Sequence, residues 1–359
     1  MSVLSRRALN RALLRRQFLM ERTGRTPLEV IGHLVAMQAQ EPNWPYVGLW
    51  SRIDGFTQAQ LGELLDRRLV VRSALLRGTQ HLAVAGDFRR FRPVLQPVLD
   101  RTASTAYFRK ASAGLDTAAL TAAGAEILAG RTLPRRELAR LLALRHPGRE
   151  GKLLAGEVEL RTPLVHTPET AMWGRWGTRN AISVTRAEDW LGGSLEPAPV
   201  RDLVRRYLAA YGPAGVMDVQ AWSGLTRLRE VVDAMRGELR RYRDAEGREL
   251  FDLESAPELP DPETPVPVRF LPAFDNLLLG HADRSRVIGD ADRRRVMPGA
   301  AMVLPTFLVD GFVHGSWSVK DGTLRLVPFR ALGAAEACAV TEEAGRLLPF
   351  LGAEDVAYV

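Results

Sequence analysis

The chain has 359 residues, which is too long for one ordinary hydrophobic core and predicts several packed units. Its 46% apolar and 25% charged residues are typical of a globular protein, and no apolar run reaches the roughly 18 residues of a membrane helix. The single cysteine, Cys338, excludes an internal disulfide and a zinc site built from cysteines, while a net charge of +7 permits nucleic acid as a partner without selecting it.

Arginine supplies almost all of the positive charge, because lysine occurs only at Lys110, Lys152 and Lys320. A guanidinium suits phosphate, since its planar fork donates two hydrogen bonds at once, although codon bias in a GC-rich genome gives the same excess. Residues 1–20 carry arginines among leucines but no uncharged apolar block or small-residue cleavage site. We therefore expect a cytoplasmic protein that makes no membrane contact.

The first 112 residues follow a helix, helix, helix, hairpin order. Residues 4–17 have apolar residues at helical spacing, and capping boxes at Thr26 and Thr57 begin two more helices. Apolar runs at 69–71 and 81–84, which join around Arg77-Gly78, predict two strands. This is the order of elements in a winged helix.

The same order recurs twice. The second pass predicts helices at 117–128, 134–144 and 151–160, and strands at 163–166 and 181–184. The third predicts helices at 200–211, 216–222 and 226–235, and strands at 239–242 and 248–253. We therefore predict an α+β fold with three tandem winged-helix units, at 1–112, 113–195 and 196–256.

The rest of the chain has a different pattern. Proline and acidic residues dominate 251–267 and predict a linker. Beyond it, Asp310-Gly311 and Asp321-Gly322 stand between apolar runs and predict two hairpins, and a last helix is expected at 332–348. Residues 257–359 are thus predicted to form a small antiparallel β unit with a closing helix.

Common catalytic motifs are missing from the sequence. It has no P-loop, no Gly-x-Gly-x-x-Gly after a strand and no His-Glu-x-x-His, and its six histidines do not fall at metal-ligand spacing. We therefore expect neither a metal nor another cofactor.

Two glutamines one residue apart, Gln38 and Gln40, come directly before Glu41-Pro42 and a run of aromatic residues. Positions i and i+2 point to opposite sides of a helix but to the same side of an extended chain. The two amides therefore face one pocket only if the second helix unwinds near Ala39. Otherwise they cap helix carbonyls or lie in solvent.

This segment resembles the glutamine-x-glutamine motif of the AlkZ-type bacterial DNA glycosylases, a winged-helix family related to YcaQ. Gln40 favours the AlkZ branch, because YcaQ-like members carry aspartate there. Gly215 departs from the threonine expected after Ala214. Further similar segments span the chain, at 76–82 (an arginine-x-threonine-x-histidine strand), 205–208, 211–214, 218, 222–224, 271–275, 283–284, 310–311 and 315–317.

The resemblance implies hydrolysis of the N-glycosidic bond of N7-alkylguanine and related alkylpurines in double-stranded DNA, with interstrand crosslinks as substrates of some members. An N7-alkylated purine is already cationic and leaves without a general acid. Gln38 and Gln40 are then expected to hold the water and to stabilise the sugar cation. Glu41 is a less favoured general base, and the absence of a lysine near the motif predicts a monofunctional enzyme without a lyase step.

Arginine is expected to contact the DNA. Arg77 and His81, on the first wing, are the candidates nearest the lesion. A loop predicted at 283–297 carries candidates for phosphate or minor-groove contacts, with solvated loop arginines as the alternative. These candidates are Arg284, Arg286, Arg293, Arg294 and Arg295.

Two other classes of function remain open. A winged-helix transcription regulator binds undamaged DNA without catalysis, but it usually has one winged helix with a dimerisation or ligand domain. A scaffold uses its winged helices to bind protein. We favour the glycosylase, with no obligatory protein partner. The adduct, base flipping, the oligomeric state and the choice between general repair and self-resistance to one alkylating natural product also remain open.

Overall fold

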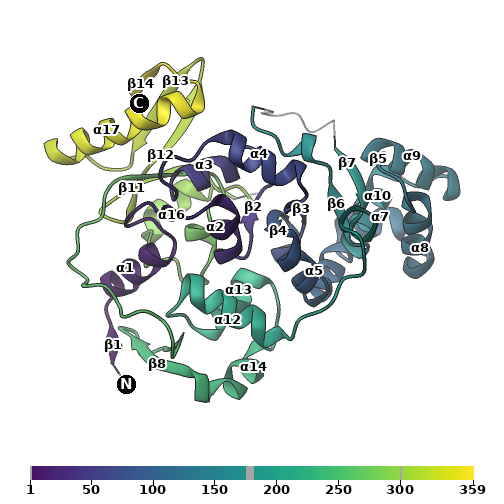
Figure 1. Ribbon diagram of the computed structural model, residues 1–359, viewed down its shortest axis with the longest axis horizontal. Coiled ribbons are helices and arrows are strands. Elements are labelled where there is room, and N and C mark those ends of the chain that lie inside the picture. Colours follow the sequence, from purple (N-terminus) through teal and green to yellow (C-terminus); the bar gives the residue numbers. More distant parts are fainter. Residues whose placement is uncertain (1, 175–181, 300) are drawn as a thin grey trace.

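The computed structural model describes residues 2–174, 182–299 and 301–359, which form a mixed α+β fold (Figure 1). The capping box at Thr26 is confirmed, because Thr26 N–H donates to Glu29 Oε2 over 2.8 Å at the start of the second helix. The first elements are β1 (Val3–Leu4), α1 (Arg6–Arg16), α2 (Pro27–His33), β2 (Met37–Gln38), α3 (Trp44–Trp50), α4 (Gln58–Asp66), β3 (Val70–Ala74), the 3-10 turn η1 (Leu76–Gly78) and β4 (Gln80–Val84).

Three helices that the sequence did not predict follow β4. They are α5 (Ala85–Val94), α6 (Gln96–Ala103) and α7 (Ala106–Ser112). Pro93 and Pro97 interrupt the helical pattern, yet Pro93 lies in the last turn of α5 and Pro97 in the first turn of α6, where proline is tolerated.

The middle of the chain matches the predicted elements closely. Gly224, with a positive φ of 83°, ends the helix α13 (Val216–Ser223) as predicted. Residue 181 of the predicted strand lies outside the described residues. The elements are α8 (Thr117–Leu128), β5 (Leu133–Pro134), α9 (Arg135–Arg145), α10 (Gly151–Arg161), β6 (Leu164–His166), η2 (Pro168–Thr170), β7 (Ser183–Arg186), α11 (Ala187–Leu191), α12 (Val200–Tyr211), α13 (Val216–Ser223), α14 (Leu228–Ala234), η3 (Arg236–Glu238), β8 (Leu239–Asp244) and β9 (Glu249–Leu253).

The C-terminal part differs from the prediction in two ways. The expected loop at 283–297 contains a helix at 290–296, and the last strand pairs parallel with β13, so the sheet is mixed. The parallel pairing arises because α17 carries the chain back across the sheet. The elements are β10 (Arg269–Leu271), α15 (Asn276–Leu279), α16 (Asp290–Val296), β11 (Thr306–Val309), β12 (Phe312–Lys320), β13 (Thr323–Pro328), α17 (Ala334–Leu351) and β14 (Asp355–Tyr358).

Three sheets organise these elements. The first two predicted hairpins join edge to edge in a six-stranded sheet, in the order β2-β4-β3-β6-β7-β5, with Arg72 opposite His166 at the join. The order is β1-β8-β9 in the second sheet and β10-β11-β12-β13-β14 in the third. Figure 1 shows α17 and α8–α10 at opposite ends of the long axis, with the 37–84 region between them.

The largest hydrophobic cluster combines residues from all four predicted segments, among them Leu14, Val165, Tyr207 and Leu271. The segments therefore pack as one body around the middle of the molecule. Within the described ranges, none of the helices has the length and apolar character that crossing a membrane requires.

Candidate active site

The glutamine-x-glutamine segment is extended. Helix α2 ends at His33, and Val35 takes a positive φ of 68° that turns the chain into β2. The condition for a common face, that the second helix does not continue through Ala39, is therefore met, and the helix ends earlier than expected because the chain turns at Val35. Met37 and Ala39 pack into the hydrophobic core, so the alternation of an extended chain directs Gln38 and Gln40 to the opposite face.

Gln38 is held by Arg77. It is 8% exposed and lies opposite His81 in the β2–β4 pair. Its Oε1 accepts a hydrogen bond from Arg77 Nη2 over 2.9 Å, and Arg77 Nη1 donates to the carbonyl oxygen of Trp222 over 2.6 Å. Arg77 takes a positive φ of 55° in the turn between β3 and β4. The guanidinium thus connects the amide of Gln38 to the end of α13.

His81 completes this cluster as a neutral imidazole. It is 1% exposed, its Nδ1 lies 2.8 Å from the carbonyl oxygen of Thr79, and its Nε2 lies 3.5 Å from Arg77 Nη2. Burial, together with the charge of Arg77, lowers the pKa of His81 to about 3. Nδ1–H therefore donates to Thr79, and the Nε2 lone pair faces the guanidinium. Burial also lowers the pKa of Arg77 to about 10, which leaves it cationic near neutral pH.

Gln40 is exposed, and its Oε1 lies 3.5 Å from the backbone nitrogen of Gln80. It lines an open cavity of about 600 Å³, whose other lining residues include Glu41, Tyr107 and Lys152. Gln38 is not a lining residue of this cavity. The two amides thus share one face of the segment, but Gln38 belongs to the Arg77 cluster and Gln40 to the cavity.

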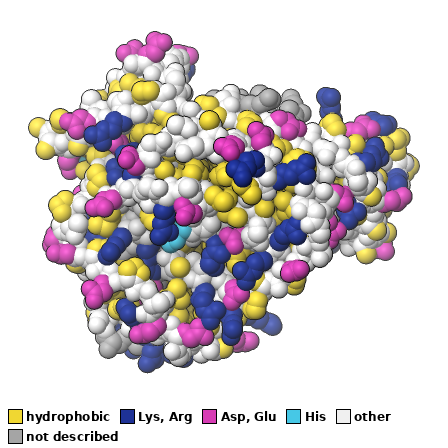
Figure 2. Space-filling model, in the orientation of Figure 1, with side chains coloured by type: hydrophobic (Ala, Val, Ile, Leu, Met, Phe, Trp, Pro, Cys, Tyr) yellow, Lys and Arg dark blue, Asp and Glu magenta, His cyan; other side chains and the backbone are white. Residues whose placement is uncertain are grey.

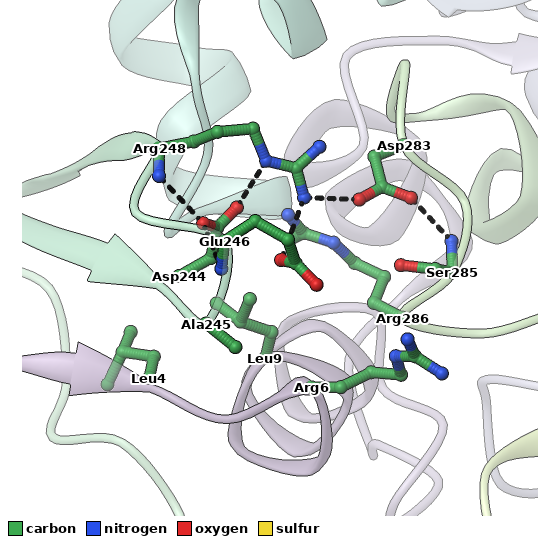
Figure 3. Close-up of a pocket in the computed structure, with 10 residues that line it drawn as sticks. All are labelled: Leu4, Arg6, Leu9, Asp244, Ala245, Glu246, Arg248, Asp283, Ser285 and Arg286. Atoms are coloured by element: carbon green, nitrogen blue, oxygen red, sulfur yellow. Dashed lines mark hydrogen bonds and ion pairs between the residues drawn. The ribbon is translucent and has the colours of Figure 1, made fainter.

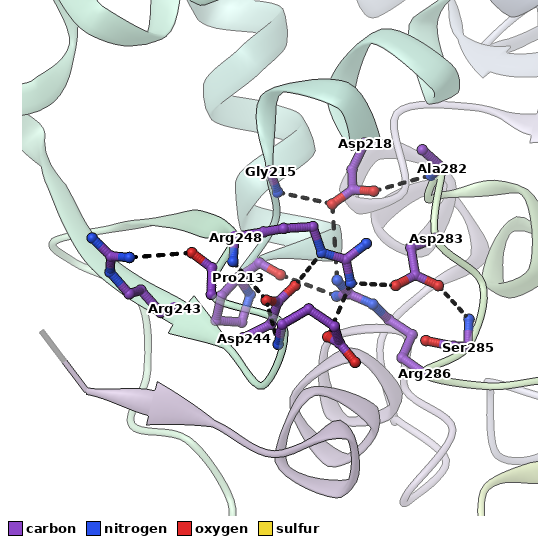
Figure 4. A network of polar contacts seen from close by, with 12 residues as sticks. Pro213, Gly215, Asp218, Arg243, Asp244, Arg248, Ala282, Asp283, Ser285 and Arg286 are labelled. Atoms are coloured by element: carbon purple, nitrogen blue, oxygen red, sulfur yellow. Dashed lines mark hydrogen bonds and ion pairs between the residues drawn. The ribbon is translucent and has the colours of Figure 1, made fainter.

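The segment around Arg286 is anchored to the rest of the fold. Asp283 pairs with Arg248 across a second cavity of about 270 Å³ beside α1 and the β8–β9 turn (Figure 3). Arg286 is 5% exposed, donates to the carbonyl oxygen of Pro213 over 3.0 Å and lies 3.8 Å from Asp218 (Figure 4). The predicted phosphate contact of Arg286 does not fit this placement, because its guanidinium is buried among protein partners.

Arg284 points elsewhere. It is half-buried, and its Nη1 lies 3.3 Å from Met297 Sδ. Burial is the main cause of the lowered pKa of Arg77, and the positive charge of Arg284 lowers that pKa further. The chain thus brings Arg284 into the electrostatic neighbourhood of the Gln38 cluster. Sequence spacing alone did not predict this proximity.

The remaining predicted arginines lie on α16. Arg294 and Arg295 are exposed, and Arg293 is half-buried. Arg295 donates to the carbonyl oxygen of Phe329 over 3.0 Å, and Arg293 lies 3.7 Å from Asp290. Figure 2 shows basic side chains interspersed with acidic ones on the face it presents.

Sequence reasoning missed three buried polar residues behind the glutamine segment. Arg72, His166 and Glu159 are 4%, 5% and 7% exposed and form a chain of contacts that ends on the backbone of Ala39 and Gln40. Arg72 between apolar strand residues was the available signal, because an arginine is rarely buried unless it is paired. Among the residues that the structure describes, no group of three His, Cys, Asp or Glu side chains is arranged to hold a metal.

Comparison with known proteins identifies relatives over nearly the whole chain. The family model described as "DNA glycosylase AlkZ-like" matches residues 31–350. The interstrand DNA cross-link repair glycosylase of Streptomyces sahachiroi is 28% identical over 356 residues, which cover 93% of this chain and 93% of that protein. The solved structure of Streptomyces sahachiroi DNA glycosylase AlkZ has a TM-score of 0.81 and 23% identity, and the match covers 99% of this chain and 100% of that chain.

Proposed function

The chain belongs to the AlkZ-like family of DNA glycosylases, and we propose that it hydrolyses the N-glycosidic bond of N7-alkylguanine and related alkylpurines in double-stranded DNA, interstrand crosslinks included. The observation that carries the proposal is the extended Gln38–Gln40 segment, with one amide fixed by Arg77 and the other on an open cavity. The crosslink proposal is supported by the Streptomyces sahachiroi relative, which is an interstrand DNA cross-link repair glycosylase. The family match gives no support to the transcription regulator.

Gln38 and Gln40 are the proposed catalytic residues. An amide does not titrate near neutral pH, but it accepts and donates hydrogen bonds and so orients a water toward the anomeric carbon. Because Arg77 occupies one lone pair of Gln38 Oε1, the second lone pair and the Nε2 protons remain to hold water. The amide oxygens also stabilise the positive charge that develops on the sugar, and one such contact is typically worth about 10²-fold or more in rate.

Arg77 and His81 are proposed to act near the lesion. Since His81 is 1% exposed, it acts through Arg77 and Gln38 as a positioning residue, without touching the DNA. Arg77 keeps its cationic fork beside the amide oxygen of Gln38. Phosphate contacts are assigned to Arg284 and to α16, through Arg293, Arg294 and Arg295.

The cavity beside Gln40 supports the proposal that the substrate carries a bulky substituent. Its volume of about 600 Å³ is in the range of small-molecule sites. Tyr107 lines it, is 62% exposed and meets Phe108 edge-on with 5.0 Å between ring centroids. An exposed aromatic ring on the cavity wall suits a planar group through stacking.

A monofunctional reaction is proposed, although the fold brings Lys152 to the same cavity. Lys152 is exposed, whereas a lysine that forms a Schiff base is usually activated by desolvation. The expected products are a free base and an abasic site. No metal or other cofactor is invoked, and the place of action is proposed to be the cytoplasmic nucleoid, where the DNA lies.

The domain organisation is proposed to be three winged-helix units, at 1–112, 113–195 and 196–256, followed by the 257–359 unit. The three antiparallel pairs β3–β4, β6–β7 and β8–β9, each after a set of helices, support this division. Three such units along one chain offer a long surface to a duplex.

The test is base release from duplex DNA that carries N7-methylguanine or a bulkier N7-alkylguanine, in buffer with a metal chelator. We expect free base from both lesions, strand breaks only after alkali, and no covalent adduct with borohydride. Absence of base release from either lesion, with equal binding of undamaged DNA, contradicts the glycosylase proposal. A borohydride adduct that Lys152→Ala removes contradicts the monofunctional proposal alone.

A further inference from the structure

The backbone of the glutamine segment is held from behind by one arginine. Arg72, on β3, donates from Nε to the carbonyl oxygen of Ala39 over 2.9 Å and from Nη2 to the carbonyl oxygen of Gln40 over 3.3 Å. Arg72 is 4% exposed, so competition from water for these bonds is limited. Two adjacent carbonyls on one planar fork fix both the position and the direction of the backbone at Gln40.

Arg72 is itself fixed from the other half of the six-stranded sheet. Its Nη1 lies 2.7 Å from His166 Nδ1, and His166 Nε2 lies 2.8 Å from Glu159 Oε1. Glu159 also accepts a hydrogen bond from Gln80 Nε2 over 2.7 Å and lies 3.0 Å from Arg135. The chain of contacts therefore runs from α10 through β6 to β3 and ends on the catalytic segment.

Only one arrangement of protons satisfies this chain. A guanidinium can only donate, so His166 Nδ1 accepts from Arg72, and His166 Nε2–H donates to the Glu159 carboxylate. Burial lowers the pKa of His166, in agreement with a neutral ring. Burial acts to raise the pKa of Glu159, but its contacts with His166, Arg135 and Gln80 outweigh burial and lower it to about 2. Glu159 is thus an anion that orients the imidazole, and the imidazole orients Arg72.

The side chains of Gln38 and Gln40 differ in their hydrogen-bond partners. Gln38 is fixed at its side chain by Arg77. Gln40 is exposed, and among the described residues the hydrogen-bond contact of its side-chain oxygen is the long one of 3.5 Å with Gln80 N. The place of the Gln40 amide in the cavity therefore depends on its backbone, which Arg72 holds at two carbonyls after the last backbone bond to β4, from Ala39 N to Gln80 O over 2.7 Å.

We propose that Arg72, His166 and Glu159 form a positioning relay through which the second segment of the chain sets the catalytic geometry of Gln40. The proposal rests on the proposed function for its effect on rate. The relay residues also line the cavity with Gln40, so whatever fills the cavity meets the relay and the amide together. Arg72 and His166 face each other where the first two hairpins join, which makes this join part of the site.

Arg72→Lys is the direct test, because an ammonium keeps the charge but cannot span both carbonyls and the imidazole. We expect the single-turnover rate of base release to fall by about 10- to 100-fold, with DNA affinity unchanged. Arg92→Lys is the matched control. Arg92 is also fully buried and donates to the carbonyl oxygen of Leu160 over 2.9 Å, but it does not contact residues 37–40. A second variant, Glu159→Gln, removes the anion with little change of shape and should lower the rate in the same direction.

A double-mutant cycle identifies the residue through which the relay acts. In a Gln40→Ala background, Arg72→Lys should lower the single-turnover rate little further. In a Gln38→Ala background, it should lower the rate by the same factor as in the wild type. An equal loss in both backgrounds, or the same loss of rate in Arg92→Lys, overturns the relay.

Hydrogen–deuterium exchange of the 37–41 amides tests the relay without any reaction. Exchange there should become faster in Arg72→Lys and Glu159→Gln but not in Arg92→Lys. Unchanged exchange in both relay variants overturns the proposal even if the protein is an active glycosylase. Faster exchange in a protein that releases no base supports the relay and contradicts only the proposed function.

Discussion

The amide oxygen of Gln38 and the guanidinium of Arg77 are joined by a hydrogen bond of 2.9 Å, and the same guanidinium reaches the carbonyl oxygen of Trp222. The three residues come from β2, the turn before β4 and the end of α13, so separate parts of the chain converge on one amide that we propose to be catalytic. Gly224 keeps this approach close, because a Cβ there would lie 3.3 Å from Arg77 Cα.

Arg77→Lys is expected to lower the rate of base release by about 10- to 100-fold, because a lysine cannot bridge Gln38 and Trp222 at once. Single-turnover kinetics on an N7-alkylguanine duplex measures the change. Arg101→Lys is a matched control, since Arg101 is exposed and donates to the carbonyl oxygen of Gly224 without contacting Gln38. Equal losses in the two variants would show that the contact with Gln38 is not the cause.

The buried neutral state of His81 predicts a pH-dependent stability. The folded pKa is about 3 against 6.5 for the free side chain, so between these values the unfolded chain binds a proton that the folded chain does not. The free energy of unfolding should therefore decrease as the pH falls below about 6.5, with about 2 kcal/mol lost at pH 5 from this group. Urea unfolding at pH 7.5 and 5.0 should show a smaller decrease in His81→Gln than in the wild type. Equal decreases would mean that His81 is protonated in the folded protein.

Arg294 and Arg286 are expected to respond in different ways. Arg294→Ala should weaken binding of any duplex and reduce the slope of log affinity against log salt by about 1, because one phosphate contact is lost. Arg286→Ala should leave the slope unchanged and destabilise the fold by about 1–3 kcal/mol, because Pro213 loses a buried donor. Binding titrations at several salt concentrations and thermal unfolding separate the two effects. A reduced slope in Arg286→Ala would place that side chain on the DNA.

Tyr107 is expected to discriminate between adducts. Tyr107→Ala should lower the rate for a bulky aromatic adduct by about tenfold, because stacking is typically worth about 1–3 kcal/mol. The rate for N7-methylguanine should not change, since a methyl group does not reach the ring. Tyr107→Phe retains the aromatic ring and should behave as the wild type. An equal loss on both lesions would assign Tyr107 a structural role.

Local patterns predicted local structure well. The capping boxes at Thr26 and Thr57 begin α2 and α4, and Gly224 ends α13 with the left-handed conformation that favours glycine. The join of β3 to β6 was not predicted, because Arg72 and His166 are 94 positions apart and no periodicity encodes such a contact. The parallel strand β14 was missed for the same reason.

The candidate site was predicted only in part. Gln38 and Gln40 were selected by resemblance, and extended geometry rather than an unwound helix explains their common face. The burial of Arg286 was not predicted, because the sequence of a predicted loop does not distinguish a buried arginine from an exposed one. Glu159 was missed because only the folded sheet brings α10 behind the glutamine segment.

The rate of base release from duplex N7-alkylguanine, compared among the wild type, Gln38→Ala, Gln40→Ala and Glu41→Gln, tests the central claim most directly. We predict release by the wild type, a loss of about 100-fold or more in each glutamine variant, and retention of most of the rate in Glu41→Gln. Full activity in both glutamine variants, or loss of activity in Glu41→Gln alone, would contradict catalysis by the amide pair and leave Glu41 as the general base.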